Sequence, residues 1–519
     1  MTLASPRILD RFEPQPVREA DLMKLRELIA AAFPGESPGL PETVSVTVVT
    51  ADSRRVRPGA VFVAIPGTAV DGTRYVPEAV EKGAIAVVAE GRVEVPEGVT
   101  AITVPDARAA IADLAAAYYR HPAREMTVAG ITGTNGKTST SLLLRSILET
   151  AGHPAALFGT ITYEVGKRIV PAVTTTPDPV SLMGYLREAL DQGIRHAIME
   201  MSSHALVQQR TRGIDPDVGI FTNLAPEHLD YHRDFADYRA AKGLLFRGLH
   251  SSATAVLNGE DPASNHFAAQ TRAHVLRYGT TEAAEVRAGD IESGTDGISF
   301  TLSLPGGART PVRSPLLGRI NVMNSLAAAA AAHVLGYDAE QIRAGLEQLP
   351  VVPGRLESVS AGQSFTVLVD YAHTDHALVN VLRNIRTFGG DRRVITVMGC
   401  GGDRDRAKRP RMGQAAAEYS DHVVITSDNP RSEDPMRIIR DIVEGLPEHT
   451  NFEVEADRRK AIRAAVEMAS GDDIVLIAGK GHETYQIVSG VAAPFDDRRV
   501  VVEEMQRLAG GNADGATEK

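Results

Sequence analysis

The stretch Val128-Ala-Gly-Ile-Thr-Gly-Thr-Asn-Gly-Lys137-Thr138 decides how this sequence is interpreted. It follows an apolar run and precedes SLLLRSILETAG (141–152), which has helical periodicity. A glycine-rich turn between a strand and a helix directs backbone N–H groups at phosphate, and the helix N-terminus adds its dipole. We therefore predict that Lys137 reaches the β- and γ-phosphates of a nucleotide and that Thr138 ligates Mg²⁺.

The spacing of this loop is shorter than in the common pattern G-x-x-x-x-G-K-[ST], because Ile131 stands six positions before Lys137. Read as G-x-x-G-K-T, the loop is less specific on its own. The alternative is a glycine-rich turn that only starts a helix. The order strand, loop, helix favours the phosphate loop.

Short runs rich in Val and Ile alternate along the chain with Ala-, Leu- and Arg-rich stretches of helical period. Strands that are buried on both faces have this composition, and their alternation with helices predicts α/β domains with parallel sheets. Residues 274–316 are instead punctuated by glycine, which predicts an antiparallel excursion. The predicted strands are Thr127–Ile131, His196–Met199, Val218–Phe221, Phe365–Val369, Val394–Met398, Val423–Thr426 and Ile474–Ile477.

Two seams divide the chain, HPAREM (121–126) and LPVVPGR (349–355). A length of 519 residues suits about three or four domains. We predict domain boundaries near residues 124 and 352. The resulting segments are a loose N-terminal tail (1–20), an N-terminal domain (21–124), a central domain (125–351), a C-terminal domain (352–507) and a disordered tail (508–519).

The composition excludes several classes of protein. The formal net charge of −11 argues against a nucleic-acid-binding surface as the main function. A single cysteine, Cys400, excludes a disulfide within the chain, and we expect it to be a small buried residue rather than a nucleophile. No apolar run approaches the roughly 18 residues of a membrane helix, and the N-terminus does not read as a signal peptide. We expect a soluble, cytoplasmic protein that does not insert into a membrane.

Further motifs follow the phosphate loop in an order that resembles the Mur ligase family of peptidoglycan synthesis. The resemblance covers almost the whole chain. It implies an α/β protein of three domains: an N-terminal uridine-nucleotide-binding domain, a central P-loop ATPase-like domain with a parallel sheet, and a C-terminal Rossmann-like domain. The motifs are DSRRVRPGAVFVAIPG (52–67), GTNGKTST (133–140), TTTP (174–177), EMSSHALVQQR (200–210), TNLAPEHLDYH (222–232), YRAAKGLLF (238–246), LLGRINVMNSLAAAA (316–330), VPGRLE (352–357), VDYAHT (369–374), GCGGDRDRAKRP (399–410), TSDNPRSEDP (426–435), AGKGHETYQ (478–486) and FDDR (495–498).

Three residues stand out as metal-site candidates. Glu200 and His228 lie at or just beyond strand ends, where ligands bind in open α/β sheets. Taken alone, Glu200 is as consistent with a salt bridge and His228 with a packed loop. Lys242 taken alone is a solvated helix lysine, and an ammonium cannot ligate Mg²⁺. The resemblance implies that Lys242 is carbamylated by CO₂ and that it joins Glu200 and His228 around a second Mg²⁺, besides the ion at Thr138.

The resemblance also implies the nucleotide contacts. Arg355 would reach the γ-phosphate, and Asp370 and His373 would face the ribose and phosphate side. The motif after Tyr371 departs from the usual Y-A-H-T-P-D, since Asp375-His376 replaces the Pro-Asp pair. The full set implied for ATP is Gly133, Thr134, Asn135, Gly136, Lys137, Thr138, Ser139, Asn258, Asn321, Arg355, Asp370 and His373.

The acceptor and the incoming amino acid have their own candidates. The resemblance implies that UDP-MurNAc-dipeptide contacts Ser53, Thr68, Ala69, Val70, Thr175, Thr176, Ser202, Gln208 and Arg210. Asp52-Ser53-Arg54 is also consistent with a plain turn. The motif D-N-P-R (428–431) is consistent with a plain turn on its own, and the resemblance implies that it is the version that accepts meso-diaminopimelate. The residues implied for this amino acid are Arg404, Asp428, Asn429, Pro430, Arg431, Gly479 and Glu483.

The charges of the D-N-P-R motif agree with this assignment. Diaminopimelate differs from lysine by a distal carboxylate, which an arginine fork binds bidentately. Arg431 and Arg404 would supply that charge, Asn429 avoids the repulsion of an aspartate, and Glu483 with the Gly479 carbonyl would take the distal ammonium. Lysine would leave the arginine charge unpaired, and unpaired buried groups discriminate strongly.

The resemblance implies an ATP-dependent ligase that forms an acyl phosphate on UDP-MurNAc-L-Ala-D-Glu and joins it to meso-diaminopimelate. Lys137, Glu200, His228 and Lys242 would form the catalytic set. We expect a monomer whose domains close around ATP and whose partners are small molecules. The alternatives are a lysine-adding ligase, a folylpolyglutamate synthetase-like enzyme, a P-loop ATPase that switches a protein partner, and a structural or binding module.

Overall fold

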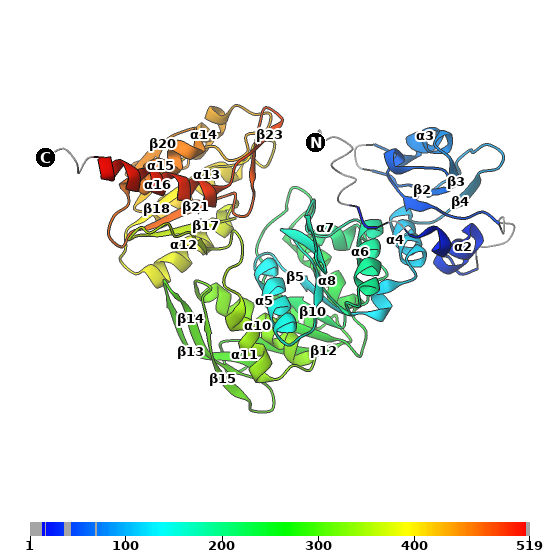
Figure 1. Ribbon diagram of the computed structural model, residues 1–519, viewed down its shortest axis with the longest axis horizontal. Coiled ribbons are helices and arrows are strands. Elements are labelled where there is room, and N and C mark those ends of the chain that lie inside the picture. The colour runs from blue at the N-terminus through cyan, green and yellow to red at the C-terminus, as the bar shows by residue number, and fades with distance from the viewer. Residues whose placement is uncertain (1–12, 16, 36–42, 68–69, 515–519) are drawn as a thin grey trace.

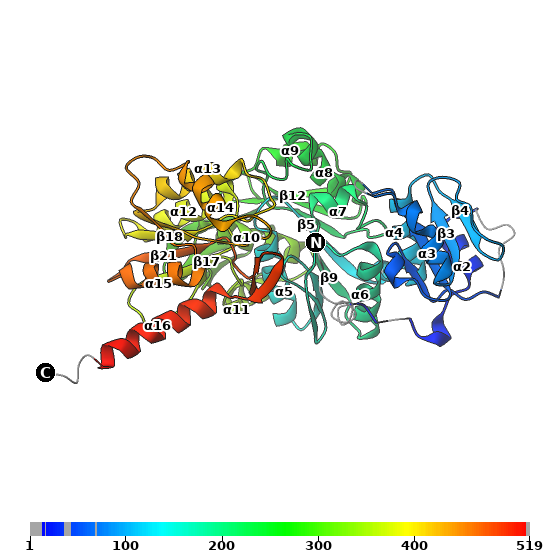
Figure 2. The ribbon, with the colours of Figure 1, turned by 90° about the horizontal axis from the view of Figure 1, so that it is seen from above.

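The computed structural model of this chain describes residues 13–15, 17–35, 43–67 and 70–514. Three α/β domains follow one another along the long axis, from the N-terminal domain through the central domain to the C-terminal domain (Figure 1). Seen from above, the central domain lies between the other two (Figure 2). The predicted fold class is therefore confirmed. Among the described residues, no helix combines the length and the apolar character that a bilayer crossing requires.

The N-terminal domain is built on a small parallel sheet. Its strand order is β1-β2-β3-β4, and helices α2 and α4 pack together beside it. Asp106 caps α4 by accepting the N–H groups of Arg108 and Ala109, which fixes where this helix begins. The elements are α2 (Leu25–Ala32), β1 (Val48–Thr50), β2 (Ala60–Ala64), α3 (Val76–Glu81), β3 (Ala84–Ala89), β4 (Thr100–Thr103) and α4 (Ala107–Tyr118), with short 3₁₀ turns at Glu19–Asp21, Ser53–Arg55, Gly72–Tyr75 and Pro122–Glu125.

The central domain contains an eleven-stranded sheet in the order β15-β14-β13-β12-β11-β10-β5-β9-β6-β7-β8. Its middle, from β12 to β6, is parallel, and both edges are antiparallel hairpins. The elements are β5 (Thr127–Thr132), α5 (Lys137–Thr150), β6 (Ala155–Phe158), β7 (Thr162–Val165), β8 (Arg168–Pro171), α6 (Pro179–Asp191), β9 (His196–Glu200), α7 (Ser203–Val207), β10 (Val218–Phe221), α8 (Phe235–Gly248), β11 (Thr254–Asn258), α9 (Ala263–Ala268), β12 (His274–Gly279), β13 (Val286–Gly294), β14 (Gly297–Ser303), β15 (Arg309–Ser314), α10 (Arg319–Val334) and α11 (Ala339–Gln348).

The antiparallel excursion predicted over 274–316 begins later than expected. β12 pairs in parallel with β11, to which helix α9 connects it, and it also pairs in parallel with β13. Only β13, β14 and β15 pair antiparallel. The prediction is therefore wrong for 274–279 and confirmed for the strands that follow.

The C-terminal domain has a six-stranded sheet in the order β16-β17-β21-β18-β19-β20, parallel except for β16. One apolar cluster joins one face to α12, α13 and α14, and another joins the opposite face to α15 and α16. The elements are β16 (Glu357–Ser358), β17 (Thr366–Asp370), α12 (Asp375–Gly389), β18 (Val394–Met398), α13 (Lys408–Tyr419), β19 (His422–Ile425), α14 (Pro435–Val443), β20 (Phe452–Val454), α15 (Arg458–Met468), β21 (Ile474–Ala478), β22 (Tyr485–Val488), β23 (Val491–Pro494) and α16 (Asp497–Asp514).

Both predicted tails need correction. At the N-terminus, Glu13 forms an ion pair with Arg55 at 3.0 Å and accepts a hydrogen bond from Arg168 of β8 through its carbonyl oxygen. The predicted loose segment 1–20 thus contacts two domains where it is described. At the C-terminus, α16 continues to Asp514 because Arg507 pairs with Glu467 and Leu508 packs against the core. Residues 1–12 and 515–519 lie outside the described part of the chain.

Candidate active site between the central and C-terminal domains

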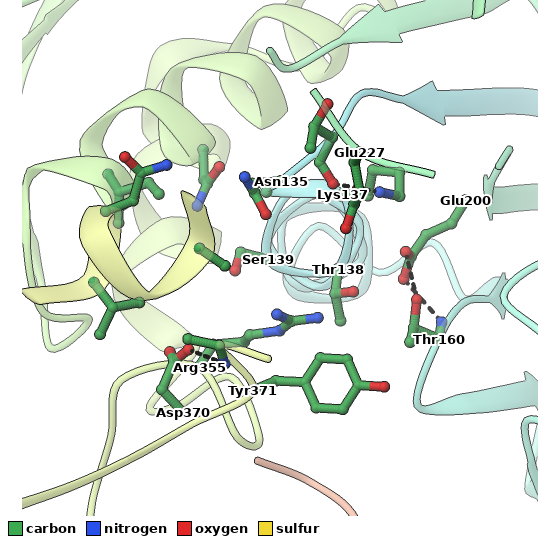
Figure 3. Close-up of a pocket in the computed structure, with 18 of the residues that line it drawn as sticks. Asn135, Lys137, Thr138, Ser139, Thr160, Glu200, Glu227, Arg355, Asp370 and Tyr371 are labelled. Carbon is green, nitrogen blue, oxygen red and sulfur yellow. Dashed lines mark hydrogen bonds between the residues drawn. The ribbon is translucent and has the colours of Figure 1, made fainter. Parts of the chain in front are cut away.

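A cavity of about 260 Å³ lies where the central domain meets the C-terminal domain. Side chains of both domains point into it, with the start of α5 seen end-on at its centre (Figure 3). Its wall contains most of the residues predicted for ATP and metal. The predicted residues that line it are Thr134, Asn135, Gly136, Lys137, Thr138, Ser139, Thr175, Glu200, Ser202, His228, Lys242, Asn321, Arg355, Asp370 and His373.

The phosphate loop has the geometry of an anion cradle. Gly133 has φ +148°, and a Cβ there would lie 1.9 Å from Thr222 Oγ1, so only glycine fits. Helix α5 begins at Lys137, directly after Gly136. Lys137 Nζ folds back and donates to the carbonyl oxygens of Gly133 (2.9 Å) and Thr134 (2.8 Å). A phosphate would replace these carbonyls as the partner of an ammonium that is already in place.

Lys242 of α8 is buried, although the pattern of its helix predicts a solvent-exposed lysine. Its side chain is only 2% exposed, and Nζ donates to the same Gly133 carbonyl at 2.7 Å. Nζ also lies 4.5 Å from the ring centroid of Tyr238. Burial, reinforced by the positive charge of Lys137, holds the pKa of Lys242 well below its usual value. The prediction of a solvated lysine from the helical pattern is therefore wrong, and Lys242 lines the cavity.

Glu200 is fully buried at the end of β9. Its carboxylate accepts the backbone N–H of Thr160 at 3.0 Å and the Thr160 hydroxyl at 2.9 Å (Figure 3). The Glu200 carbonyl accepts the hydroxyl of Thr176 at 2.7 Å. These bonds fix the carboxylate on the cavity wall, as a metal-ligating oxygen requires.

Glu227 is a cavity residue that the sequence analysis missed. It directly precedes His228, whose Nε2 lies 3.7 Å from the Glu227 carboxylate. Burial would raise the pKa of Glu227, but the neighbouring His228 and Lys137 bring it below its usual value, so the group stays ionised. Burial lowers the pKa of His228. The adjacency of an acid to a predicted metal ligand was the one available signal.

The C-terminal domain contributes Arg355, which extends toward Thr138 (Figure 3) and lies over the Tyr371 ring at 4.9 Å. Asp370 is buried and accepts the backbone N–H groups of Leu356 (2.7 Å) and Ala372 (2.8 Å), so it holds the segment that carries Arg355. Burial raises the pKa of Asp370, against the effect of Arg355. The backbone of His373 is fixed by Lys408, whose Nζ donates to the His373 carbonyl at 2.7 Å.

The Asp375-His376 departure coincides with a capped helix start. Helix α12 begins at Asp375, and the Thr374 hydroxyl accepts the N–H of Ala377 at 3.2 Å. Asp375 takes the first helical position, where proline is common and where a carboxylate interacts favourably with the helix dipole. Its carboxylate also pairs with Arg411 at 2.9 Å.

The two asparagines predicted for the adenine side lie in different places. Asn321 lines the cavity, with its amide bound to Asn324 at 2.9 Å and to the Leu317 carbonyl at 2.8 Å. Asn258 is not among the residues that line this cavity in the described part of the chain. Its amide bonds the carbonyl of Thr222 and the N–H of Glu260. A nucleotide contact of Asn258 stays a prediction.

The acceptor residues of the central domain form one network beside Glu200. Thr175 contacts Thr160 through their hydroxyls at 3.2 Å, and the Ser202 N–H donates to the Thr176 hydroxyl at 3.2 Å. Two side chains complete the network, because the guanidinium of Arg210 donates to the Thr176 carbonyl at 3.1 Å and to Gln208 at 2.7 Å. Burial lowers the pKa of Arg210. The five predicted residues therefore lie together in the structure, and their contact with the acceptor stays a prediction.

The predicted uridine contacts lie in the N-terminal domain, apart from this network. Ser53 is buried, and its hydroxyl donates to Glu78 at 3.0 Å. Val70 is exposed, and its carbonyl accepts the N–H of Gly67 at 3.1 Å. Thr68 and Ala69 lie outside the described residues. Uridine binding here stays a prediction.

The amino-acid candidates gather at the ends of β19 and β21. A Cβ built on Gly401 would lie 2.8 Å from Arg431 Nη1 and 3.9 Å from Arg404 Cγ, so both arginines flank this glycine. Arg431 has a φ of +54°, an uncommon conformation that functional residues often adopt. Gly479 has a φ of +113°, and a Cβ there would lie 2.6 Å from Asp428 Oδ2.

Asn429 and Glu483 also meet in this group, since Asn429 Nδ2 donates to Glu483 Oε2 at 2.8 Å. Pro430 connects Asn429 to Arg431. The seven residues predicted for the amino acid therefore lie close to one another. Cys400 is buried as predicted, and burial raises the pKa of its thiol to about 12, which excludes a reactive thiolate at neutral pH.

Comparison with known proteins agrees with this geometry. Three profiles match: "Mur ligase family, catalytic domain" over residues 45–119, "Mur ligase middle domain" over 131–332 and "Mur ligase, glutamate ligase domain" over 354–481. A UDP-N-acetylmuramoyl-L-alanyl-D-glutamate--2,6-diaminopimelate ligase from Geobacillus thermodenitrificans is 44% identical over 488 residues, which are 92% of this chain and 98% of that protein. One of the same name from Thermosynechococcus vestitus is 44% identical over 483 residues, 92% of this chain and 96% of that protein.

Solved structures give the same picture. A structure of a UDP-N-acetylmuramoyl-L-alanyl-D-glutamate--2,6-diaminopimelate ligase superimposes with a TM-score of 0.69 at 32% identity, covering 94% of this chain and 99% of that one. MurF from Acinetobacter baumannii shares the fold, with a TM-score of 0.62 at 21% identity over 90% of this chain and 96% of that one. The phosphate loop, the buried lysine and the two-domain cavity, together with matches that span nearly the whole sequence, establish that this chain belongs to the Mur ligase family.

Proposed function

We propose that this chain is an ATP-dependent ligase of the MurE type, which joins meso-diaminopimelate to UDP-N-acetylmuramoyl-L-alanyl-D-glutamate. The products would be the UDP-MurNAc-tripeptide, ADP and phosphate. The observation that carries the proposal is the single cavity that contains the phosphate loop, Arg355 and the start of the acceptor network at Thr175 and Ser202. Arg404 and Arg431, which flank Gly401 beside the motif at 428–431, support the choice of diaminopimelate.

The first step is phosphoryl transfer. A carboxylate oxygen of the D-Glu residue attacks the γ-phosphorus of ATP, the bond from that phosphorus to the β-bridging oxygen breaks, and ADP leaves. Lys137 releases its two loop carbonyls and donates to the β- and γ-phosphates, while Arg355 balances charge from the opposite wall. Arg210, with Thr176 beside it, holds the acceptor near Glu200.

The second step makes the amide. The free amine of diaminopimelate attacks the acyl-phosphate carbon and a C–N bond forms. The tetrahedral intermediate then expels phosphate as its C–O bond breaks, and the proton lost by the amine leaves with the phosphate. Arg404 and Arg431 fix the distal carboxylate, and Glu483 fixes the distal ammonium, so the reacting amine is oriented at the acyl carbon. The domains close around ATP to bring these groups together.

Mg²⁺ fits the donors of this cavity. Thr138 presents a hydroxyl at the start of α5, Glu200 presents a buried carboxylate, and His228 and Lys242, as a carbamate, would complete two sites. Within the described residues no three His, Cys, Asp or Glu side chains form a metal cluster, as expected when ATP oxygens and a carbamate supply ligands. When bound, Mg²⁺ neutralises phosphate charge. Enclosure of Lys242 beside the loop supports its carbamylation by CO₂.

We further propose that the enzyme acts as a monomer in the cytoplasm on these three small molecules, without nucleic acid. The test is phosphate release by the purified protein with ATP, Mg²⁺ and the acceptor, comparing meso-diaminopimelate with L-lysine. Release that needs both the acceptor and diaminopimelate, with a product heavier by one diaminopimelyl unit, is the expected result. Turnover with lysine would point to a lysine-adding ligase and would overturn the role of Arg431.

The remaining alternatives give different results in the same assay. Release that is indifferent to acceptor and amino acid would favour an ATPase switch. Glutamate addition to a folate would favour a folylpolyglutamate synthetase. Lys137→Met is the matched control, because it removes the phosphate-loop charge and should abolish release under every ligase reading.

A further inference from the structure

Lys480 is a fully buried lysine that the proposed mechanism does not use. It follows Gly479 at the end of β21, and its side chain is 0% exposed. A lysine is almost never fully buried unless it is paired. Its ammonium has two oxygen partners, Glu483 Oε2 at 3.1 Å and Asn429 Oδ1 at 3.2 Å. Both partners are predicted amino-acid contacts.

These bonds fix which way the Asn429 amide points. Lys480 Nζ and the backbone N–H of Ile487 both donate, at 3.2 and 3.0 Å, so they must face the amide oxygen. The Nδ2 group is thereby directed at Glu483 Oε2, 2.8 Å away. An aspartate in place of Asn429 would set a second carboxylate against that oxygen.

The same bonds orient Glu483. Its contacts with Lys480 and Asn429 both use Oε2, and the carboxylate as a whole is 17% exposed. In the described structure this leaves Oε1 as the oxygen available to a ligand. The ammonium also lies over the Tyr485 ring, whose centroid is 5.7 Å from Lys480 Nζ. Lys480 thus has no route to solvent and is held between the two loops.

We propose that Lys480 is a positioning residue of the amino-acid pocket, which fixes Asn429 and Glu483 so that one carboxylate oxygen meets the distal ammonium of the substrate. This inference rests on the proposed function, since it refines the same site. The bond from Lys480 Nζ to Glu483 Oε2 holds the carboxylate in one orientation, so Glu483 does not have to be ordered when the substrate ammonium binds. The residue acts through its two partners and not on the reacting atoms.

The test is steady-state kinetics of Lys480→Met, which keeps the length of the side chain and removes its charge. We expect the KM for meso-diaminopimelate to rise about 10- to 100-fold, the range of a lost hydrogen bond to a charged group. The KM values for ATP and for the acceptor should not change, and kcat should change little. Lys460→Met is the matched control, because Lys460 is an exposed lysine of α15 in the same domain.

A double variant separates positioning from folding. If Lys480 acts through Glu483, Lys480→Met combined with Glu483→Gln should raise the KM little beyond Glu483→Gln alone. Equal changes in all three KM values, or an unchanged KM for the amino acid in a folded Lys480→Met, would overturn the proposal. If the wild-type protein uses L-lysine instead, the diaminopimelate function fails, and the Lys480 effect is then expected on the KM for lysine.

Discussion

The buried ion pair between Arg458 and Asp497 gives the sharpest test of how the C-terminal domain holds its loops. Both side chains are 0% exposed, and the guanidinium donates to both carboxylate oxygens, with Nε and Nη2 each at 2.7 Å. Nη2 also donates to the Ala478 carbonyl at 3.0 Å, and Nη1 to the Ser427 carbonyl at 3.4 Å. One guanidinium thus braces the ends of β19 and β21, where the amino-acid loops begin.

Arg458→Met would leave the Asp497 carboxylate buried without its partner. Breaking a buried pair from one side costs about 3–5 kcal/mol, and both distances here are short enough to place the loss in that range. For a domain of this size each kcal/mol lowers Tm by about 2–4 °C, so we expect a fall of about 6–20 °C. Replacing both partners, as Arg458→Met with Asp497→Leu, should recover most of the loss, since no buried charge remains.

Differential scanning calorimetry measures this directly, because each domain of a multidomain protein can unfold in its own transition. Arg459→Met is the matched control: Arg459 is the next residue, 41% exposed, and it pairs with the half-exposed Glu503 and with the buried Glu504, which keeps Arg463 and Arg507 as partners when Arg459 is replaced. A surface pair contributes about 0–1 kcal/mol. If Arg458→Met and Arg459→Met lowered Tm equally, or if the double variant were no more stable than Arg458→Met, the reasoning would be refuted.

Four other outcomes are expected. Lys242→Arg keeps a cation but blocks the carbamate, so kcat for phosphate release should fall about 10²–10³-fold, and the intact mass of the wild-type protein alone should rise by one CO₂ in bicarbonate. Arg431→Ala should lower the preference for diaminopimelate over lysine in kcat/KM by about 10- to 100-fold, through loss of a charged hydrogen bond. Glu227→Gln should raise the Mg²⁺ concentration for half-maximal rate about 10-fold. Hydrogen bonds from Arg463, Arg459 and Arg507 lower the pKa of Glu504 to about 2. The wild type should therefore be more stable than Glu504→Gln at neutral pH, and this difference in unfolding free energy should disappear as the pH falls from about 4.5 toward 2.

Much of the architecture was readable from the sequence because local and tertiary preferences agree. Val394–Met398 is apolar on both faces and became a central parallel strand. The phosphate loop lies between a strand and a helix, β5 and α5, as predicted. The disordered tail predicted over 508–519 begins too early, because the composition of residues 510–519 indicates disorder, whereas the pairing of Arg507 with Glu467 and the packing of Leu508 favour the helix.

The site was harder to predict from the sequence where a residue's role depends on contacts with distant segments. The helical pattern around Lys242 indicates a surface position, and only the approach of Gly133, 109 residues earlier in the chain, shows why it is buried. Lys480 was missed for the same reason, since its partner Asn429 comes from another loop. Glu227 was missed although its neighbour His228 was predicted as a metal ligand. Asp370 was found, but its hydrogen bonds to Leu356 and Ala372 are invisible in the sequence.

Three loops of the C-terminal domain are packed too tightly to move separately. A Cβ on Gly354 would lie 2.1 Å from the backbone nitrogen of His482, and the rings of Tyr371 and His482 are 4.8 Å apart. The segment that carries Arg355 and the segment that carries Glu483 therefore shift as one unit. Any effect of nucleotide on the affinity for the amino acid that this unit transmits is matched by the same factor in the reverse direction, whichever ligand arrives first. The affinity of an inhibitor that imitates the amino acid should therefore be measured with nucleotide present.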